Sequence, residues 1–216
     1  MNVDESLVRS IVEDIVKNMT GEKREKLVPV GVSNRHIHLS REHLDILFGK
    51  GYELNLHKSL MGDEFASKEL VTIIGPSLKS IENVRILGPV RKQSQVEISR
   101  TDTFTLKLNP PVRPSGVLNG SSPITIVGPN GVIKLAEGCI IANRHIHMTP
   151  RDSHEYGLQD GDYVDVLAQT DEKKTMFFDV QVRVGENYRL EMHIDTDDAN
   201  AAALNNKSLV KLIKRT

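Results

Sequence analysis

Two short histidine motifs contain the residues whose types and spacing best suit metal chemistry. Residues 34–40 (NRHIHLS) recur as residues 143–149 (NRHIHMT), with five identical residues in succession. The histidines of the two copies are His36, His38, His145 and His147. In an extended strand alternate side chains share one face, so the two imidazoles of each His-x-His point the same way. Zinc binds neutral imidazole, and catalytic zinc sites commonly use three protein ligands, so each motif predicts a site that needs one further donor.

The third donors must come from distant strands. His193 lies in residues 189–195 (RLEMHID), where strand alternation places it on a different face from its apolar neighbours. Glu97 lies between two β-branched residues in residues 95–99 (QVEIS), so it would be a costly buried charge unless it is paired or metal-bound. A solvent-facing strand glutamate is the alternative. We expect His193 and Glu97 to complete the two sites.

Two other segments suit an anion. Arg91 follows the turn residues Gly88-Pro89, and its planar guanidinium can hold two oxygens of a phosphate. Ser115 ends the rigid segment 110–116 (PPVRPSG), where a hydroxyl and backbone amides can meet an oxyanion. A surface arginine is the alternative for Arg91. The chain has neither a Walker-type motif nor a Gly-x-Gly-x-x-Gly sequence, which argues against nucleotide hydrolysis and a Rossmann cofactor.

Composition excludes several classes of protein. The 216 residues carry 28 Lys and Arg against 29 Asp and Glu, so no overall positive charge is available to bind nucleic acid. The single cysteine, Cys139, excludes an intramolecular disulfide and any zinc module built on several thiolates. No apolar run approaches the roughly 20 residues needed to cross a bilayer. We therefore expect a cytoplasmic protein with no nucleic-acid or membrane partner.

The hydrophobic pattern predicts a mainly β fold with short capping helices. The pattern of residues 3–19 predicts an amphipathic helix, with a linker to residue 26, and its apolar face suits packing, dimerisation or docking to a partner. The repeated motif indicates an internal duplication with two β-barrel units and equivalent strand-to-helix corners. A hairpin is expected at residues 124–135, and the other expected strands are 28–32, 84–87, 96–99, 103–108, 163–168, 176–184 and 190–194.

The chain resembles the phosphate propanoyltransferases of bacterial microcompartments from about residue 27 to the C-terminus. The resemblance is carried by the two histidine motifs and by residues 88–102 (GPVRKQSQVEISRTD), 110–116 and 191–202 (EMHIDTDDANAA). It implies transfer of a short acyl group, propanoyl and also acetyl, between coenzyme A and inorganic phosphate. It further implies two interlocked barrels, with residues 27–34 and 143–216 in one unit and residues 35–142 in the other.

The resemblance also assigns roles to individual residues. It implies two zinc ions, one held by His36, His38 and Glu97, the other by His145, His147 and His193. Arg91 matches the family's phosphate-binding arginine, and Ser115 matches its active-site serine.

The remaining expectations concern partners, location and competing functions. Some members of the family use an N-terminal helix for encapsulation, which implies a shell or core partner and a location inside a microcompartment. A homodimer or a larger homo-oligomer is expected. The competing hypotheses are a binuclear zinc hydrolase and a non-catalytic, zinc-stabilised assembly protein.

Overall fold

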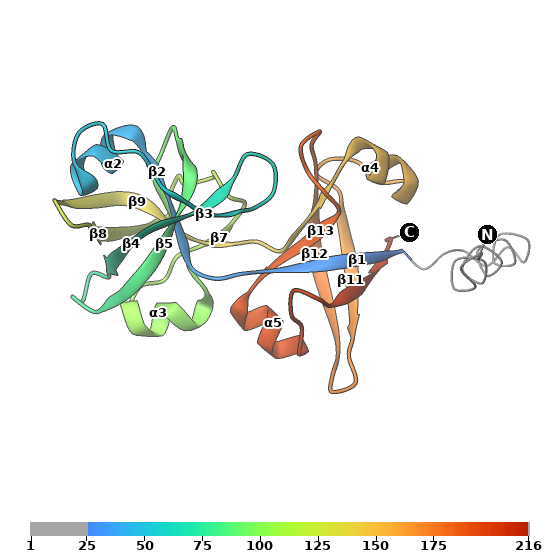
Figure 1. Ribbon diagram of the computed structural model, residues 1–216. Coiled ribbons are helices and arrows are strands. Elements are labelled where there is room, and N and C mark those ends of the chain that lie inside the picture. The colour runs from blue at the N-terminus through green and yellow to red at the C-terminus, as the bar shows by residue number, and fades with distance from the viewer. Residues whose placement is uncertain (1–25, 216) are drawn as a thin grey trace, which may run out of the picture.

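The described part of the chain consists of two closed β-barrels with short helices between the strands (Figure 1). The structure is a computed structural model and describes residues 26–215. This architecture confirms the predicted mainly β fold. The amphipathic helix predicted at residues 3–19 lies outside the described residues.

The first barrel combines the first described strand with the C-terminal part of the chain. Its strand order is β1-β13-β10-β12-β11-β14, and β14 pairs back with β1. Every second residue of β11 is buried, as a strand with one face on a core requires. The strands are β1 (Leu27–Ser33), β10 (His145–Met148), β11 (Tyr163–Gln169), β12 (Lys174–Val184), β13 (Glu191–Asp195) and β14 (Leu209–Ile213).

The second barrel is formed by strands from the middle of the chain. Its order is β4-β5-β2-β6-β9-β8, and β8 closes the ring by pairing with β4. The predicted hairpin is confirmed, because β8 and β9 are antiparallel with Ile126 opposite Ile133. The ring strands are β2 (His36–Ser40), β4 (Phe65–Ile74), β5 (Ser80–Arg91), β6 (Gln95–Glu97), β8 (Ser122–Val127) and β9 (Val132–Ala142). Two short strands, β3 (Leu56–Ser59) and β7 (Val112–Arg113), pair with β4 and β9.

The two barrels share one pairing pattern, which extends the duplication seen in the histidine motifs. β2 is parallel to β5 and antiparallel to β6, and β10 is likewise parallel to β12 and antiparallel to β13. β6 is parallel to β9, whereas β13 is parallel to β1. Thus β1 takes in one barrel the place that β9 takes in the other. β1 and β9 each lead directly into a histidine motif of the opposite barrel, and Figure 1 shows the chain passing from β1 of one barrel to β2 of the other.

Each strand that carries candidate ligands ends in a helix cap. The cap side chains accept hydrogen bonds from backbone N–H groups of the first helical turn. The helices, each followed by its cap, are α2 (Arg41–Phe48; Ser40), α3 (Arg100–Leu106; Ser99), α4 (Pro150–Tyr156; Thr149) and α5 (Thr196–Ala202; Asp195). In the described part of the chain no helix is long and apolar enough to cross a membrane. These caps stop each strand at a defined residue and so place the side chains just before it.

The strand predicted at residues 103–108 is wrong, because α3 occupies most of this segment. Ser99 accepts a hydrogen bond from the Asp102 N–H, and the Asp102 carboxylate accepts one from the Ser99 N–H. This reciprocal capping box starts a helix despite the β-type residues that follow it. The alternation of Thr, Phe and Leu in the sequence is therefore outweighed by the cap.

Replacing Ser99 with alanine is expected to lower the free energy of unfolding by about 1 kcal/mol, since one N-cap hydrogen bond is lost. Chemical denaturation followed by circular dichroism measures the change. Thr101→Ala in the same helix is the control, because its exposed side chain makes no part of the cap. Equal stability of the Ser99→Ala variant and the unmodified protein would contradict a stabilising cap.

Candidate metal and anion site between the two barrels

A cavity of about 720 Å³ lies between the barrels and is lined by residues of both. Its lining includes the candidate ligands of the two histidine motifs, together with Arg91 and Ser115. The strands that cross between the barrels bring these residues to one place, although the two histidine motifs are more than 100 positions apart along the chain. The cavity is therefore the candidate functional site.

The first ligand cluster forms where β2 and β6 pair. His36 lies directly opposite Glu97, and Nε2 of His36 is 3.5 Å from Oε2 of Glu97. His38 follows on the same face, while Ile37 between them is fully buried in the barrel core. The potential ligand atoms of His36, His38 and Glu97 all lie within 4.8 Å of one another. Glu97 is 9% exposed, so a solvent-facing strand glutamate is excluded.

The second cluster repeats this arrangement in the other barrel. His145 on β10 lies opposite His193 on β13, in the same register as His36 and Glu97. The ring centroids of His147 are 4.7 Å from those of both His145 and His193. The potential ligand atoms of the three residues lie within 4.8 Å of one another. The fold thus brings together both predicted sets of three donors.

Backbone carbonyls orient the first histidine of each motif. Nδ1 of His36 is 2.9 Å from the carbonyl oxygen of Asn34, and Nδ1 of His145 is 2.9 Å from that of Asn143. Because a carbonyl only accepts, Nδ1 must carry a proton, and in the neutral ring this leaves the lone pair on Nε2. Histidine ligands of metals are commonly held in this way.

Burial lowers the pKa of three imidazoles of the clusters. It lowers the pKa of His38 to about 2 and, with the charge of His145 adding to it, that of His147 to about 2. Burial also lowers the pKa of His145 to about 4, while the carboxylate of Glu97 opposes this shift. Both clusters line the same cavity, so they belong to one candidate site.

The donors fit divalent metal ions. Nδ1 of His38 and Nδ1 of His147 are buried and have no hydrogen-bond partner among the described residues. An unsatisfied buried polar atom costs about 1–3 kcal/mol, a cost that a cation at the ring would offset. Sets of three imidazoles, or of two imidazoles and one carboxylate, are typical of zinc. The residues present therefore suit one zinc ion in each cluster.

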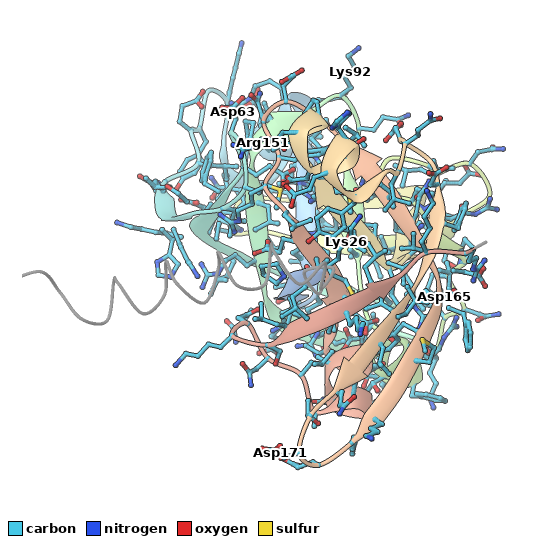
Figure 2. All side chains as sticks on the ribbon, turned by 90° about the vertical axis from the view of Figure 1, so that its right-hand side faces the viewer. Lys26, Asp63, Lys92, Arg151, Asp165 and Asp171 are labelled. Atoms are coloured by element: carbon cyan, nitrogen blue, oxygen red, sulfur yellow. The ribbon has the colours of Figure 1, made fainter. Side chains whose placement is uncertain are left out.

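Arg91 and Ser115 meet at the wall of the same cavity. Arg91 ends β5 and donates a hydrogen bond from Nη1 to Oγ of Ser115 at 3.2 Å. Its Nη2 donates to Oε1 of Glu64, which lies in the loop before β4. Lys92 is the next residue, but its side chain extends away from the molecule into solvent (Figure 2). Arg91 is thus the cation that this turn presents to the cavity.

Sequence reasoning missed Gln95, Glu64 and Glu191. Gln95 is 2% exposed and donates hydrogen bonds to both Glu97 and Ser115. Glu191 stands two residues before His193, and its carboxylate is 2.8 Å from Nε2 of that residue. The signal for Gln95 and Glu191 was their position two residues before a candidate ligand, because alternate strand residues share a face. Glu64 carried no such signal, since only loop geometry brings it to Arg91.

Known proteins with similar sequences show the family of this chain. Residues 29–205 match the family model described as phosphate propanoyltransferase. A phosphate propanoyltransferase of Lachnoclostridium phytofermentans is 52% identical over 96% of this chain and 97% of its own length. Proteins of the same name from Thermotoga maritima and Salmonella typhimurium are 53% and 43% identical, over 89% and 92% of this chain and 91% and 94% of theirs. The chain therefore belongs to the phosphate propanoyltransferase family.

Proposed function

We propose that this protein transfers a short acyl group between coenzyme A and inorganic phosphate. In this reaction acyl-coenzyme A and phosphate give acyl phosphate and free coenzyme A. The observation that carries the proposal is the single cavity that joins two metal-ligand clusters to the Arg91 and Ser115 pair. Metal ions in such a cavity can polarise a carbonyl oxygen, and the arginine and serine can bind an oxyanion. Family membership supports an acyl thioester and phosphate as the two substrates.

In the proposed mechanism Arg91 binds and orients phosphate. Its guanidinium is planar and always charged, so it can donate two parallel hydrogen bonds to phosphate oxygens. Nη2 donates to Glu64, and both residues line the cavity. Ser115 adds a hydroxyl beside the guanidinium. Together these residues present one oxygen of phosphate to the thioester carbonyl.

The histidine clusters hold the metal ions in this proposal. Zinc, when bound, supplies Lewis acidity toward the acyl carbonyl and phosphate oxygens. The carbonyl oxygens of Asn34 and Asn143 set the tautomer of the first histidine in each cluster. Burial keeps His38, His145 and His147 unprotonated near neutral pH, so their nitrogens are available as donors.

The acyl group passes directly from sulfur to phosphate. A phosphate oxygen forms the new bond to the carbonyl carbon, and the bond from that carbon to the coenzyme A sulfur breaks. The sulfur leaves with the bonding electron pair, and the proton lost by phosphate balances the thiolate. Thiols have a pKa near about 8.5, so this leaving group needs no strong acid. No covalent intermediate on the enzyme is required.

Cys139 takes no part in this mechanism and is expected to be inert in the folded protein. It is fully buried in the second barrel core, and burial raises the pKa of its thiol to about 12. The thiolate, which is the reactive form, is therefore negligible at neutral pH. A chromogenic disulfide should label Cys139 only after denaturation, and the Cys139→Ala variant should keep turnover within about twofold, a factor worth less than about 0.5 kcal/mol. Rapid labelling of the native protein, or loss of turnover in Cys139→Ala with metal retained, would contradict this assignment.

The proposed function is tested by the release of free thiol from propanoyl-coenzyme A, with and without phosphate, on protein of measured metal content. We expect release that depends on phosphate, with acyl phosphate as the product. Release that needs no added phosphate and yields the free acid would instead identify a binuclear hydrolase. Metal-loaded protein with neither activity would support the non-catalytic assembly protein.

Several finer points stay predictions. Acetyl and propanoyl groups differ by one methylene, worth about 1 kcal/mol of apolar contact, so we propose that both are accepted as substrates.

We also propose that the protein is a homo-oligomer, which light scattering tests. Microcompartment location through residues 3–19 is tested by fusing this segment to a fluorescent protein in cells that form such compartments. A fusion that stays diffuse would contradict that location signal.

A further inference from the structure

Gln95 occupies a buried position in β6 where every hydrogen-bonding group of its side chain is used. Its Nε2 donates to Oε1 of Glu97 and, at 2.9 Å, to Oγ of Ser115. Its Oε1 accepts from the backbone N–H of Gly116 at 2.7 Å. Because a backbone N–H only donates, Oε1 must face Gly116 and the amide orientation is unambiguous. Gln95 thus ties the loop that carries Ser115 to the strand that carries Glu97.

This network determines what the Ser115 hydroxyl can do. Its oxygen accepts hydrogen bonds from Nε2 of Gln95 and from Nη1 of Arg91, two groups that only donate. A hydroxyl oxygen has two acceptor lone pairs, so both are occupied. The one hydroxyl hydrogen must therefore point in a third direction, and Ser115 lines the cavity. Among the described residues no base accepts a hydrogen bond from Ser115, which leaves no group to activate it as a nucleophile.

The other barrel has a counterpart of Gln95 at the equivalent strand position. Glu191 stands in β13 where Gln95 stands in β6, two residues before the third donor of its cluster. Glu191 offers an acceptor to the imidazole of His193, whereas Gln95 offers a donor to the carboxylate of Glu97. Both positions therefore support a candidate ligand with the complementary group. Of the two, the amide of Gln95 also donates to Ser115.

We propose that Gln95 is a positioning residue that turns Ser115 into a hydrogen-bond donor for the phosphate held by Arg91. This inference rests on the proposed function, because it assigns a role within the same site. It requires that Gln95 act through Ser115 on phosphate affinity and not on the acyl thioester. It also requires that Ser115 never become acylated during turnover.

The test compares Gln95→Met, which keeps the side-chain length but removes both donors, with Ser115→Ala and the double variant. Each single variant is expected to raise KM for phosphate about tenfold, the effect of losing about 1.4 kcal/mol of binding, and to leave KM for propanoyl-coenzyme A unchanged. The double variant is expected to match Ser115→Ala, since residues that act through one another are not additive. Ser115→Thr should restore most of the phosphate affinity. Gln169→Met, at an exposed position of β11, is the matched control.

Two readouts besides activity separate this role from a structural one. Metal content per chain should equal that of the unmodified protein in Gln95→Met, whereas lost metal would show that Gln95 acts on the reaction through Glu97 and would overturn the proposal. Mass spectrometry after incubation with propanoyl-coenzyme A without phosphate should find Ser115 unmodified, and a propanoyl group on Ser115 would also overturn it. Additive effects of Gln95→Met and Ser115→Ala on KM for phosphate would also overturn the proposal. Absence of phosphate-dependent turnover in the unmodified protein would instead defeat the proposed function.

Discussion

Replacing His145 with alanine is expected to lower kcat/KM for phosphate-dependent thiol release at least about a thousandfold, equivalent to about 4 kcal/mol of transition-state stabilisation. The metal content should fall from about two ions per chain to about one, because two donors hold zinc far more weakly than three. His36→Ala is expected to have the same effect through the other cluster. The two variants are symmetric because His145 and His36 hold equivalent positions in the duplicated barrels.

The physical reason is that the donors of each cluster are already in place. His145 is buried, its Nδ1 proton is donated to Asn143, and it lies opposite His193 across the strand pair. Alanine removes one donor. No neighbour in the cluster can replace this donor, since His147 and His193 already belong to the same set of three. The measurements are steady-state kinetics and elemental analysis of the purified variants.

His57→Ala is the matched control, because His57 lies exposed on β3, outside both clusters. It should keep full metal content and turnover. A chelator should reproduce the loss of activity in the unmodified protein, and added zinc should restore it. Near-normal turnover of His145→Ala after loss of one metal ion would contradict a role for the second cluster in the reaction.

Replacing Arg91 with alanine is expected to lower kcat/KM for phosphate about 100- to 1,000-fold. Two charge-assisted hydrogen bonds, together worth about 3–4 kcal/mol, would be lost from the bound anion. The loss should appear mainly as a higher KM for phosphate, with KM for propanoyl-coenzyme A little changed. Arg91→Lys should recover part of the affinity, because lysine keeps the charge but lacks the planar pair of donors.

Arg151→Ala is the control for Arg91, since Arg151 is exposed on α4 and does not line the cavity. Metal content should be unchanged in Arg91→Ala, because the hydrogen bonds of its guanidinium to described residues go to Ser115 and Glu64, which are not candidate ligands. Equal loss of affinity for both substrates would show that Arg91 maintains the shape of the cavity and does not bind phosphate. Unchanged kinetics would support a role for the cavity other than phosphate transfer.

The ligand clusters were predictable because their signals are local or simply periodic. In His-x-His, strand alternation alone places both imidazoles on one face, and the duplicated motif marks two equivalent strands. The same alternation identified Glu97 and His193, which the fold places opposite His36 and His145. The error at residues 103–108 has an equally local cause, since the capping box of Ser99 and Asp102 starts a helix that the β-type residues after it do not indicate.

Contacts between segments far apart in the chain could not be derived in this way. The bond between Arg91 and Glu64, and the link from Gln95 to the Ser115 loop, depend on where loops end in space. The sequence of each segment is compatible with many such placements, because loop backbones have no periodic pattern that constrains their side chains.

Local order along the chain was enough to predict the candidate donors and the two β units, from residue types, strand alternation and a repeated motif. Bringing the two donor sets into one cavity required the crossing of β1 and β9 between barrels. That crossing depends on which strand pairs with which, and pairing partners are chosen by the closure of both barrel cores together. The tertiary structure therefore brings two motifs, each recognisable in the sequence, into one shared candidate site.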